Sequence, residues 1–156
     1  MKRSLFYLLA ILTLDVWGFV TVLSGSIPDW LRPHETILLC LLTGGIGGLV
    51  YCMRGLYVNT CARAAGWDPK WMPWYFIRPI VSHLCGGISY IVLKTGLLVL
   101  ESQQKTDSHE IGFYLLAFVA GLNVDKFVLK IEDLALTTWG IDKSRAAGGA
   151  GKDSDR

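Results

Sequence analysis

Residues 80–100 read IVSHLCGGISYIVLKTGLLVL, and this stretch is long enough as a helix to cross a membrane. A helix rises about 1.5 Å per residue, and the hydrocarbon core of a bilayer is roughly 30 Å thick. The stretch carries one full charge, Lys94. If the helix begins at Ile80, Lys94 lies about 21 Å along it and therefore inside the bilayer. A lysine at that depth needs a charged partner, a watery cavity or a path to the surface.

Asp15 is the candidate partner for Lys94. It is the single charge in the first apolar stretch, residues 5–23, and lies about 15 Å from the start of that stretch. If both helices begin on the same side of the membrane, the two charges lie at depths within one helical turn. We therefore predict an intramembrane pair. Two interpretations stay open: a neutralised pair that fixes the register of two helices, or a polar lining for an ion or proton path.

The composition indicates an all-α integral membrane protein. Of the 156 residues, 52% are hydrophobic and only 18% are charged, which is unusual for a soluble chain of this length. The length allows one bundle and no separate soluble domain of ordinary size. Residues 5–23 also fit a secretory signal peptide, but the length of the run, the central Asp15 and the lack of a small-residue cleavage site favour a retained span.

We expect one domain over residues 1–140, a four-helix transmembrane bundle. The expected spans are 5–23, 37–53, 80–100 and 111–129. The last span is expected to continue as an amphipathic helix over about 126–139, because apolar residues recur there at steps of three to four. Residues 141–156 are rich in glycine and charge and lack periodicity, so we predict a disordered tail.

The distribution of lysine and arginine gives an orientation. With four spans, one side of the membrane holds every lysine and arginine outside the spans except Arg32 and Lys105. Short cytoplasmic loops carry the excess of positive charge. This pattern predicts that both termini are cytoplasmic.

Small residues offer surfaces for close helix packing. Gly44 and Gly48 are spaced as GxxxG and leave a bare strip of backbone on one helix face, which lets a neighbouring helix approach. The same role is open to small residues in the later spans, namely Gly86, Gly87, Ala117 and Gly121. Packing within one chain and an oligomer interface are both compatible with these residues.

Two further polar groups lie near the expected cytoplasmic side. The long connection over residues 54–79 mixes aromatic and basic residues, an arrangement typical of the headgroup layer, and its belt residues are Trp67, Trp71, Trp74 and Arg78. Membrane lipids are therefore expected partners, and nucleic acid is not. Asn123 and Asp125 form a polar group near the cytoplasmic end of the last span, either where the helix emerges into the headgroups or as a gate or ion ligand.

Metal binding and catalysis have little support in the sequence. The paired spacing of a zinc site is absent from the candidate ligands His83, Cys52, Cys61 and Cys85. We therefore predict no metal and no cofactor. Hydrolase, nucleotide-binding and dinucleotide-binding motifs are absent. We predict that the chain is not an enzyme.

Three classes of function remain in order of support. The first is an oligomeric channel-like or membrane-perturbing effector or sensor, the second a membrane scaffold that anchors a cytoplasmic protein partner, and the third a small membrane enzyme. The architecture, with four short spans and a last span that runs into the helix AGLNVDKFVLKIEDLALTTWG, resembles small membrane components of bacterial antiphage systems, such as the Kiwa membrane subunit or four-span effectors. That resemblance implies an inner-membrane homo-oligomer that senses phage or perturbs the membrane together with a soluble partner.

The orientation is testable with reporter fusions along the full-length chain. We expect fusions after Gly25 and Lys105 to be external and fusions after Trp67 and Gly151 to be cytoplasmic, because the basic residues gather on the cytoplasmic side. Paired alkaline phosphatase and fluorescent protein reporters measure this. A cytoplasmic signal at Lys105 would contradict the four-span topology.

Overall fold

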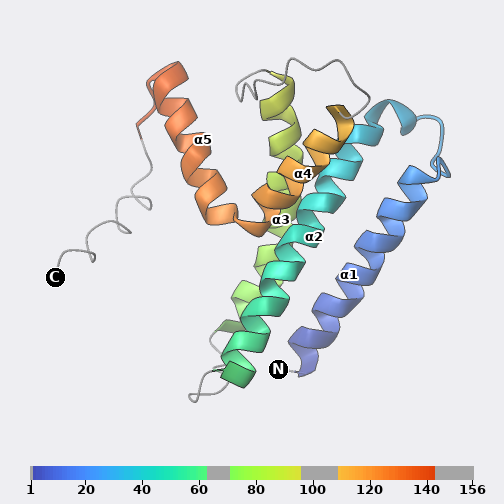
Figure 1. The fold of residues 1–156 in the computed structure, drawn as a ribbon, viewed down its shortest axis with the longest axis vertical. Coiled ribbons are helices and arrows are strands. Elements are labelled where there is room, and N and C mark those ends of the chain that lie inside the picture. Colours follow the sequence, from blue (N-terminus) through green and yellow to red (C-terminus); the bar gives the residue numbers. More distant parts are fainter. Residues whose placement is uncertain (1, 63–70, 96–108, 143–156) are drawn as a thin grey trace. The chain divides into compact units, whose positions relative to one another are not determined.

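The chain is a set of helices in its computed structural model, which describes residues 2–62, 71–95 and 109–142. In chain order the elements are α1 Lys2–Leu23, η1 Arg32–His34, α2 Glu35–Tyr57, η2 Val58–Ala62, α3 Met72–Lys94, α4 His109–Leu122 and α5 Val124–Trp139 (Figure 1). No strand occurs in these described residues, so the prediction of an all-α chain is confirmed. The chain divides into two compact units, Met1–Asn123 and Val124–Arg156, where the sequence predicts one domain.

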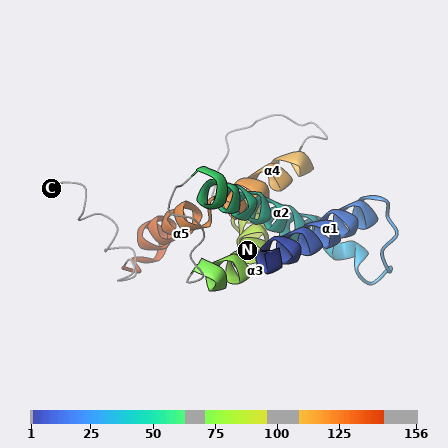
Figure 2. The ribbon, with the colours of Figure 1, turned by 90° about the horizontal axis from the view of Figure 1, so that it is seen from below.

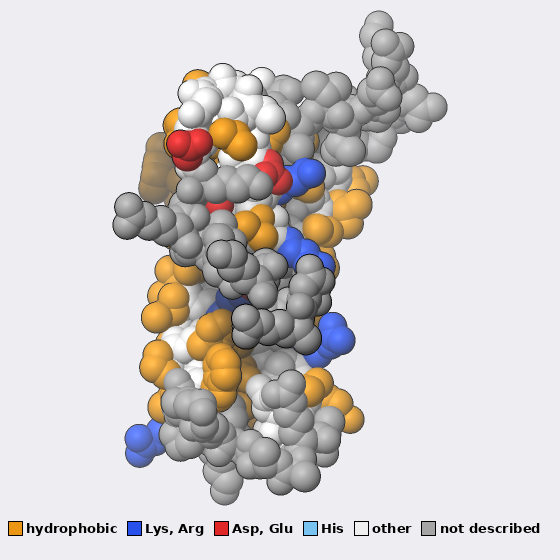
Figure 3. Space-filling model, turned by 90° about the vertical axis from the view of Figure 1, so that its left-hand side faces the viewer, with side chains coloured by type: hydrophobic (Ala, Val, Ile, Leu, Met, Phe, Trp, Pro, Cys, Tyr) orange, Lys and Arg blue, Asp and Glu red, His pale blue; other side chains and the backbone are white. Residues whose placement is uncertain are grey.

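Three helices are long and apolar enough to cross a membrane. They are α1, α2 with its flanking turns, and α3, and the number rises to four if α4 and α5 together count as one broken span. Over much of the described part of the face in Figure 3, apolar side chains reach the surface. The described helices are therefore compatible with a membrane protein of three to four spans.

The helix that contains the third predicted span begins at Met72, eight residues before the predicted start at Ile80. Pro73 lies in the first turn, where a missing backbone N–H costs nothing, and the helix then continues through Pro79. The expected start at Ile80 was wrong because proline was taken to end the preceding connection. Lys94 is now the last residue of α3, about 33 Å from Met72, and so lies at the far end of the span. Residues 96–100 of the predicted span lie outside the described residues.

The predicted continuous helix over residues 111–139 is also wrong. Helix α4 ends at Leu122 and α5 begins at Val124, with Asn123 in a turn between them. Glycine and asparagine are poor helix formers, so Gly121 and Asn123 favour a break at this point. At about 1.5 Å per residue, α4 covers roughly 21 Å and is too short to span a bilayer alone. The predicted amphipathic helix is present as α5, and residues 143–156 of the predicted tail lie outside the described residues.

Helix α2 is the centre of the first unit. It packs against α1, α3 and α4, and Figures 1 and 2 place it between α1 and α4. Two clusters of buried residues hold α1 to its neighbours, one around Leu8 and Leu49 and the other around Val22 and Leu39. The start of α1 and the start of α3 lie at the same end of this unit (Figure 1).

Glycine backbones meet where α2, α3 and α4 cross. A Cβ atom added at Gly44 would lie 2.6 Å from the Cα of Gly86, and a Cβ added at Gly121 would clash with the backbone of Gly44. A Cβ at Gly48 would clash with the hydroxyl of Ser82. The GxxxG strip is therefore buried within the chain. This confirms packing within one chain, and it corrects the oligomer interpretation of Gly44 and Gly48, because no surface remains there for a second copy.

The glycine crossing predicts a difference between two alanine substitutions in α4. Gly121→Ala places a methyl group against the backbone of Gly44, whereas Gly112→Ala meets nothing within 4 Å. We expect Gly121→Ala to lower the free energy of unfolding by about 1–3 kcal/mol, the usual cost of overpacking. Gly112→Ala, the matched control, is expected to leave it unchanged or slightly raised, since alanine is the better helix former. Unfolding of the detergent-solubilised protein with sodium dodecyl sulfate measures both, and equal effects would contradict the crossing.

Candidate functional site

A carboxylate and an imidazole meet inside the first unit. Oδ1 of Asp15, in the middle of α1, lies 3.1 Å from Nε2 of His83 in α3. The Asp15 side chain is 8% exposed and the His83 side chain 26% exposed. Asp15 lies about 20 Å along α1 and His83 about 17 Å along α3, so both are well inside the apolar lengths of their helices.

Helix α2 makes room for this contact. A Cβ atom at Gly45 would clash with the His83 ring, so the imidazole occupies space that any other residue would fill. The second ring nitrogen, Nδ1, lies 2.7 Å from the carbonyl oxygen of Pro79, one turn earlier in α3. Both ring nitrogens therefore have partners, and the plane of the ring is fixed between α1 and its own helix.

The two partners of His83 set the number of protons in the site. The Pro79 carbonyl can only accept a hydrogen bond, and an ionised Asp15 can also only accept. A neutral imidazole donates from one nitrogen only, so it satisfies both contacts only if Asp15 carries a proton and donates it to Nε2. Otherwise the ring is an imidazolium and donates from both nitrogens. In either arrangement the pair has no net charge, and one proton lies on Nε2 or on Oδ1.

One acceptor of the pair is left over. Oδ2 of Asp15 is buried and makes no hydrogen bond with any described residue, although buried polar atoms usually have a partner. No titratable side chain lies one helical turn from Asp15 in α1 or one turn from Gly45 in α2. The residues at these positions are Ile11, Phe19, Leu41 and Leu49. Asp15 and His83 are thus a polar pair among apolar neighbours, and Oδ2 of Asp15 has no hydrogen-bond partner in the described residues.

The predicted pairing of Asp15 with Lys94 was wrong. Nζ of Lys94 lies 3.0 Å from the hydroxyl of Tyr90, at the exposed end of α3. The reasoning from depth was sound, because Asp15 and its true partner lie within one helical turn in depth. The error was the register of α3: with the helix starting at Met72, His83 takes the depth that was assigned to Lys94. Under the predicted start at Ile80, His83 would lie close to the membrane surface, which is why it was not considered as a partner.

The predicted small residues lie in the interior of the first unit. Gly86 and Gly87 of α3 face α2, where a Cβ at Gly86 would clash with the carbonyl of Cys40 and a Cβ at Gly87 would lie 2.9 Å from the Leu41 side chain. Ala117 of α4 is fully buried. These residues build the packing around the polar pair and do not take part in it.

Asn123 and Asp125 are not shown as one group. Asn123 is half-buried in the turn that ends the first unit, and Asp125 is exposed in the first turn of α5 in the second unit.

The aromatic and basic belt is partly built into α3. Trp71 precedes the helix and is half exposed, Trp74 lies in its first turn, and Trp67 lies outside the described residues. Arg78 is buried against neighbouring rings and is not exposed on the surface of the chain. Its guanidinium lies 4.7 Å from the centre of the Tyr51 ring and 5.3 Å from that of Trp74, and these aromatic faces compensate for its burial.

Within the described ranges, no three His, Cys, Asp or Glu side chains gather as a metal site would require. Cys61, one of the residues considered for such a site, has its side chain outside them. Comparison with protein-family models, curated proteins and solved structures finds no match to this chain. The polar pair is therefore interpreted from its own geometry.

A double-mutant cycle tests the contact between Asp15 and His83. Each single change, Asp15→Ala or His83→Ala, leaves the other group buried without its partner, so we expect a coupling energy of about 0.5–3 kcal/mol between them. The matched control is the cycle of Asp15→Ala with Lys94→Ala, which we expect to be additive within about 0.5 kcal/mol. Unfolding free energies in detergent measure both cycles. Additivity in the first cycle would contradict the contact between Asp15 and His83, and coupling in the second would restore Lys94 as a partner of Asp15.

Proposed function

We propose that this chain is an oligomeric, channel-like membrane effector or sensor that responds to protons at Asp15 and His83. The observation that carries the proposal is the 3.1 Å contact between a carboxylate and an imidazole inside two apolar helices. Ionisable residues within membrane spans are costly, by at least about 2.5 kcal/mol for a charged group at the centre on insertion scales, and they commonly mark ion or proton pathways.

The chemistry of the pair supports a response to protons. Histidine is the side chain whose charge ordinarily changes near neutral pH. The pair as built carries one shared proton and no net charge; a second proton would make it cationic, and loss of the shared proton would make it anionic. The unpartnered Oδ2 of Asp15 is a position at which a further proton could be accepted. Because the pair bridges α1 and α3, any change in its charge acts on the contact between these helices.

The exposed apolar face of α1 is the surface that we propose for contact between copies of the chain. Only 17% of the apolar window of α1 is buried within the chain, compared with 44% for α2 and for α3. Large side chains that remain exposed along α1 are Leu5, Phe6, Leu9, Leu14, Val16, Trp17, Val20 and Leu23. The glycine strip of α2 is already occupied, and α1 has the smallest buried share of the three candidate spans, so we propose its exposed face as the contact with a second copy. His83, a quarter exposed beside α1, would then lie near such a contact.

We propose that the chain lies in a bacterial inner membrane with both termini inside. The proposed role in antiphage defence comes from the resemblance in architecture to small membrane components of antiphage systems.

A membrane scaffold is the second candidate function, and α5 favours it. This helix forms a unit distinct from the bundle and has an apolar side that includes Val124, Phe127 and Ile131, which are buried or half-buried, beside charged residues. Such a helix is suited to hold a cytoplasmic protein.

Proton flux through reconstituted protein tests the proposal against the scaffold. Full-length protein is reconstituted in liposomes that contain a trapped pH indicator, and a potassium diffusion potential is applied. The protein should let this potential drive protons across the membrane, which changes the internal pH. We expect His83→Gln to lower the rate about 100-fold, because a positioned proton-transfer group is lost. Lys94→Met, the matched control, should retain the wild-type rate. Absence of flux in the wild type, or full flux in His83→Gln, would contradict the proposal and favour the scaffold.

A further inference from the structure

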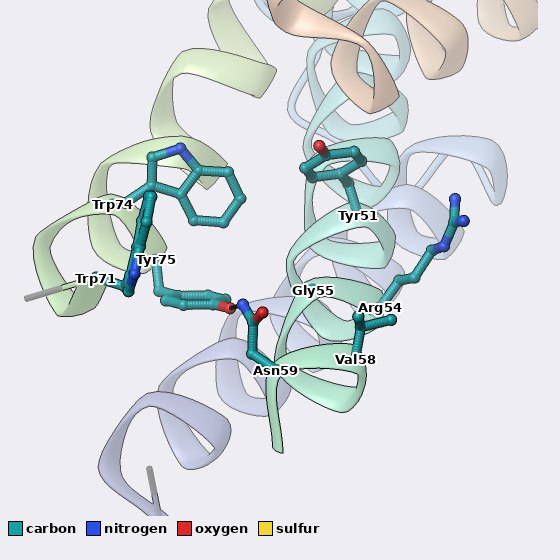
Figure 4. Close-up of a pocket in the computed structure, with 8 residues that line it drawn as sticks. All are labelled: Tyr51, Arg54, Gly55, Val58, Asn59, Trp71, Trp74 and Tyr75. Carbon is teal, nitrogen blue, oxygen red and sulfur yellow. Dashed lines mark hydrogen bonds between the residues drawn. The ribbon is translucent and has the colours of Figure 1, made fainter. Parts of the chain in front are cut away.

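A cavity of about 370 Å³ lies where α2 ends and α3 begins. Figure 4 shows it between the last turns of α2 and the first turn of α3. The residues that line it are Tyr51, Arg54, Gly55, Val58, Asn59, Trp71, Trp74 and Tyr75. The cavity is part of neither the polar pair nor the glycine crossing, so it is a separate feature of the first unit.

Aromatic rings in fixed positions form the walls. Trp74 and Tyr75 meet edge to face with ring centres 5.0 Å apart, and Trp74 also lies 6.0 Å from Tyr51 across the cavity. The hydroxyl of Tyr75 accepts a hydrogen bond from the side-chain amide of Asn59 at 3.2 Å, which joins η2 to α3 at one end of the cavity (Figure 4). At Gly55 the wall is bare backbone, and a Cβ there would lie 3.4 Å from the Tyr75 hydroxyl. The cavity is thus apolar on its sides and polar at one end.

The described lining of the cavity has one charged residue, the cation Arg54. Arg54 is exposed at its edge and makes no ion pair or hydrogen bond through its side chain with any described residue. A second arginine lies next to two of the walls: the guanidinium of Arg78 lies 4.7 Å from the centre of the Tyr51 ring and 5.3 Å from that of Trp74. None of the described lining residues is acidic. An occupant that carries negative charge beside an apolar part would match both the charge and the walls.

We propose that this cavity binds the phosphate of an anionic phospholipid headgroup, with the glycerol and upper acyl carbons against the aromatic rings. The cavity lies at the ends of two helices that are long and apolar enough to span a membrane, at the level where headgroups would lie. Guanidinium groups bind phosphate through two parallel hydrogen bonds, and basic pockets between spanning helices are suited to anionic lipids. A zwitterionic headgroup would bring its own cation close to Arg54 and Arg78 and is expected to bind less well.

Native mass spectrometry of the full-length protein tests the site. The protein in detergent is mixed with phosphatidylglycerol or phosphatidylcholine, and retained lipid is counted after gas-phase removal of detergent. We expect wild type to retain phosphatidylglycerol at least about fivefold more than phosphatidylcholine, a difference of about 1 kcal/mol. Arg54→Gln should abolish this preference. Arg3→Gln, the matched control, removes an exposed arginine near the same end of the bundle but outside the cavity and should keep it.

A second variant and a competition experiment distinguish a lipid site from a site for free phosphate. Arg54→Lys retains the charge without the two-pronged geometry and should give an intermediate preference. Inorganic phosphate or glycerol 3-phosphate, added at the lipid concentration, should not displace phosphatidylglycerol, because neither reaches the aromatic walls. Displacement by either would show a site for free phosphate and overturn the lipid assignment. Equal retention of phosphatidylglycerol by Arg54→Gln and Arg3→Gln would overturn the site itself.

Discussion

The bare backbone of α2 over residues 44–48 is the constraint on which the first unit depends. Within a membrane, helices gain little from burying apolar side chains against one another, and close van der Waals contact becomes the main source of association. The sequence GGIGG supplies that contact with a different neighbour at each glycine. Gly44 meets Gly86, Gly45 meets the His83 ring, Gly47 meets the backbone of Phe118, and Gly48 meets Ser82. One short segment therefore places both α3 and α4 against α2.

The polar pair is a consequence of the same constraint. His83 reaches Asp15 only because α2 presents no side chain at Gly45, and its ring is oriented by the carbonyl of Pro79. Helix α1 packs mainly on α2 and touches α3 much less. In the described residues, polar contacts between α1 and α3 are the pair itself and the bond from the Tyr7 hydroxyl to the carbonyl of Phe76, at 3.4 Å. The pair is thus a main polar connection between α1 and α3.

The sequence predicted the helical class, the GxxxG contact and a charge that needs a partner at the depth of Asp15. These features follow from periodicity, small-residue spacing and the cost of charge in lipid, all of which are local or general. The register of α3 could not be predicted in the same way, because Pro73 and Pro79 both signal a loop in a single sequence, and only the packing of Tyr75 and Arg78 against α2 shows that the helix continues through them. The partner of Asp15 was missed for that one reason.

The cavity and the polar pair lie at different depths along α3 but share one helix. Arg78, stacked on the rings behind the cavity, is five residues before His83, and Pro79 lies between them and provides the carbonyl that orients the imidazole. Proline lacks the N–H that would bond to the preceding turn, so this part of α3 has one backbone bond fewer than a regular helix. This turn of α3 therefore lies between the arginine beside the cavity wall and the polar pair.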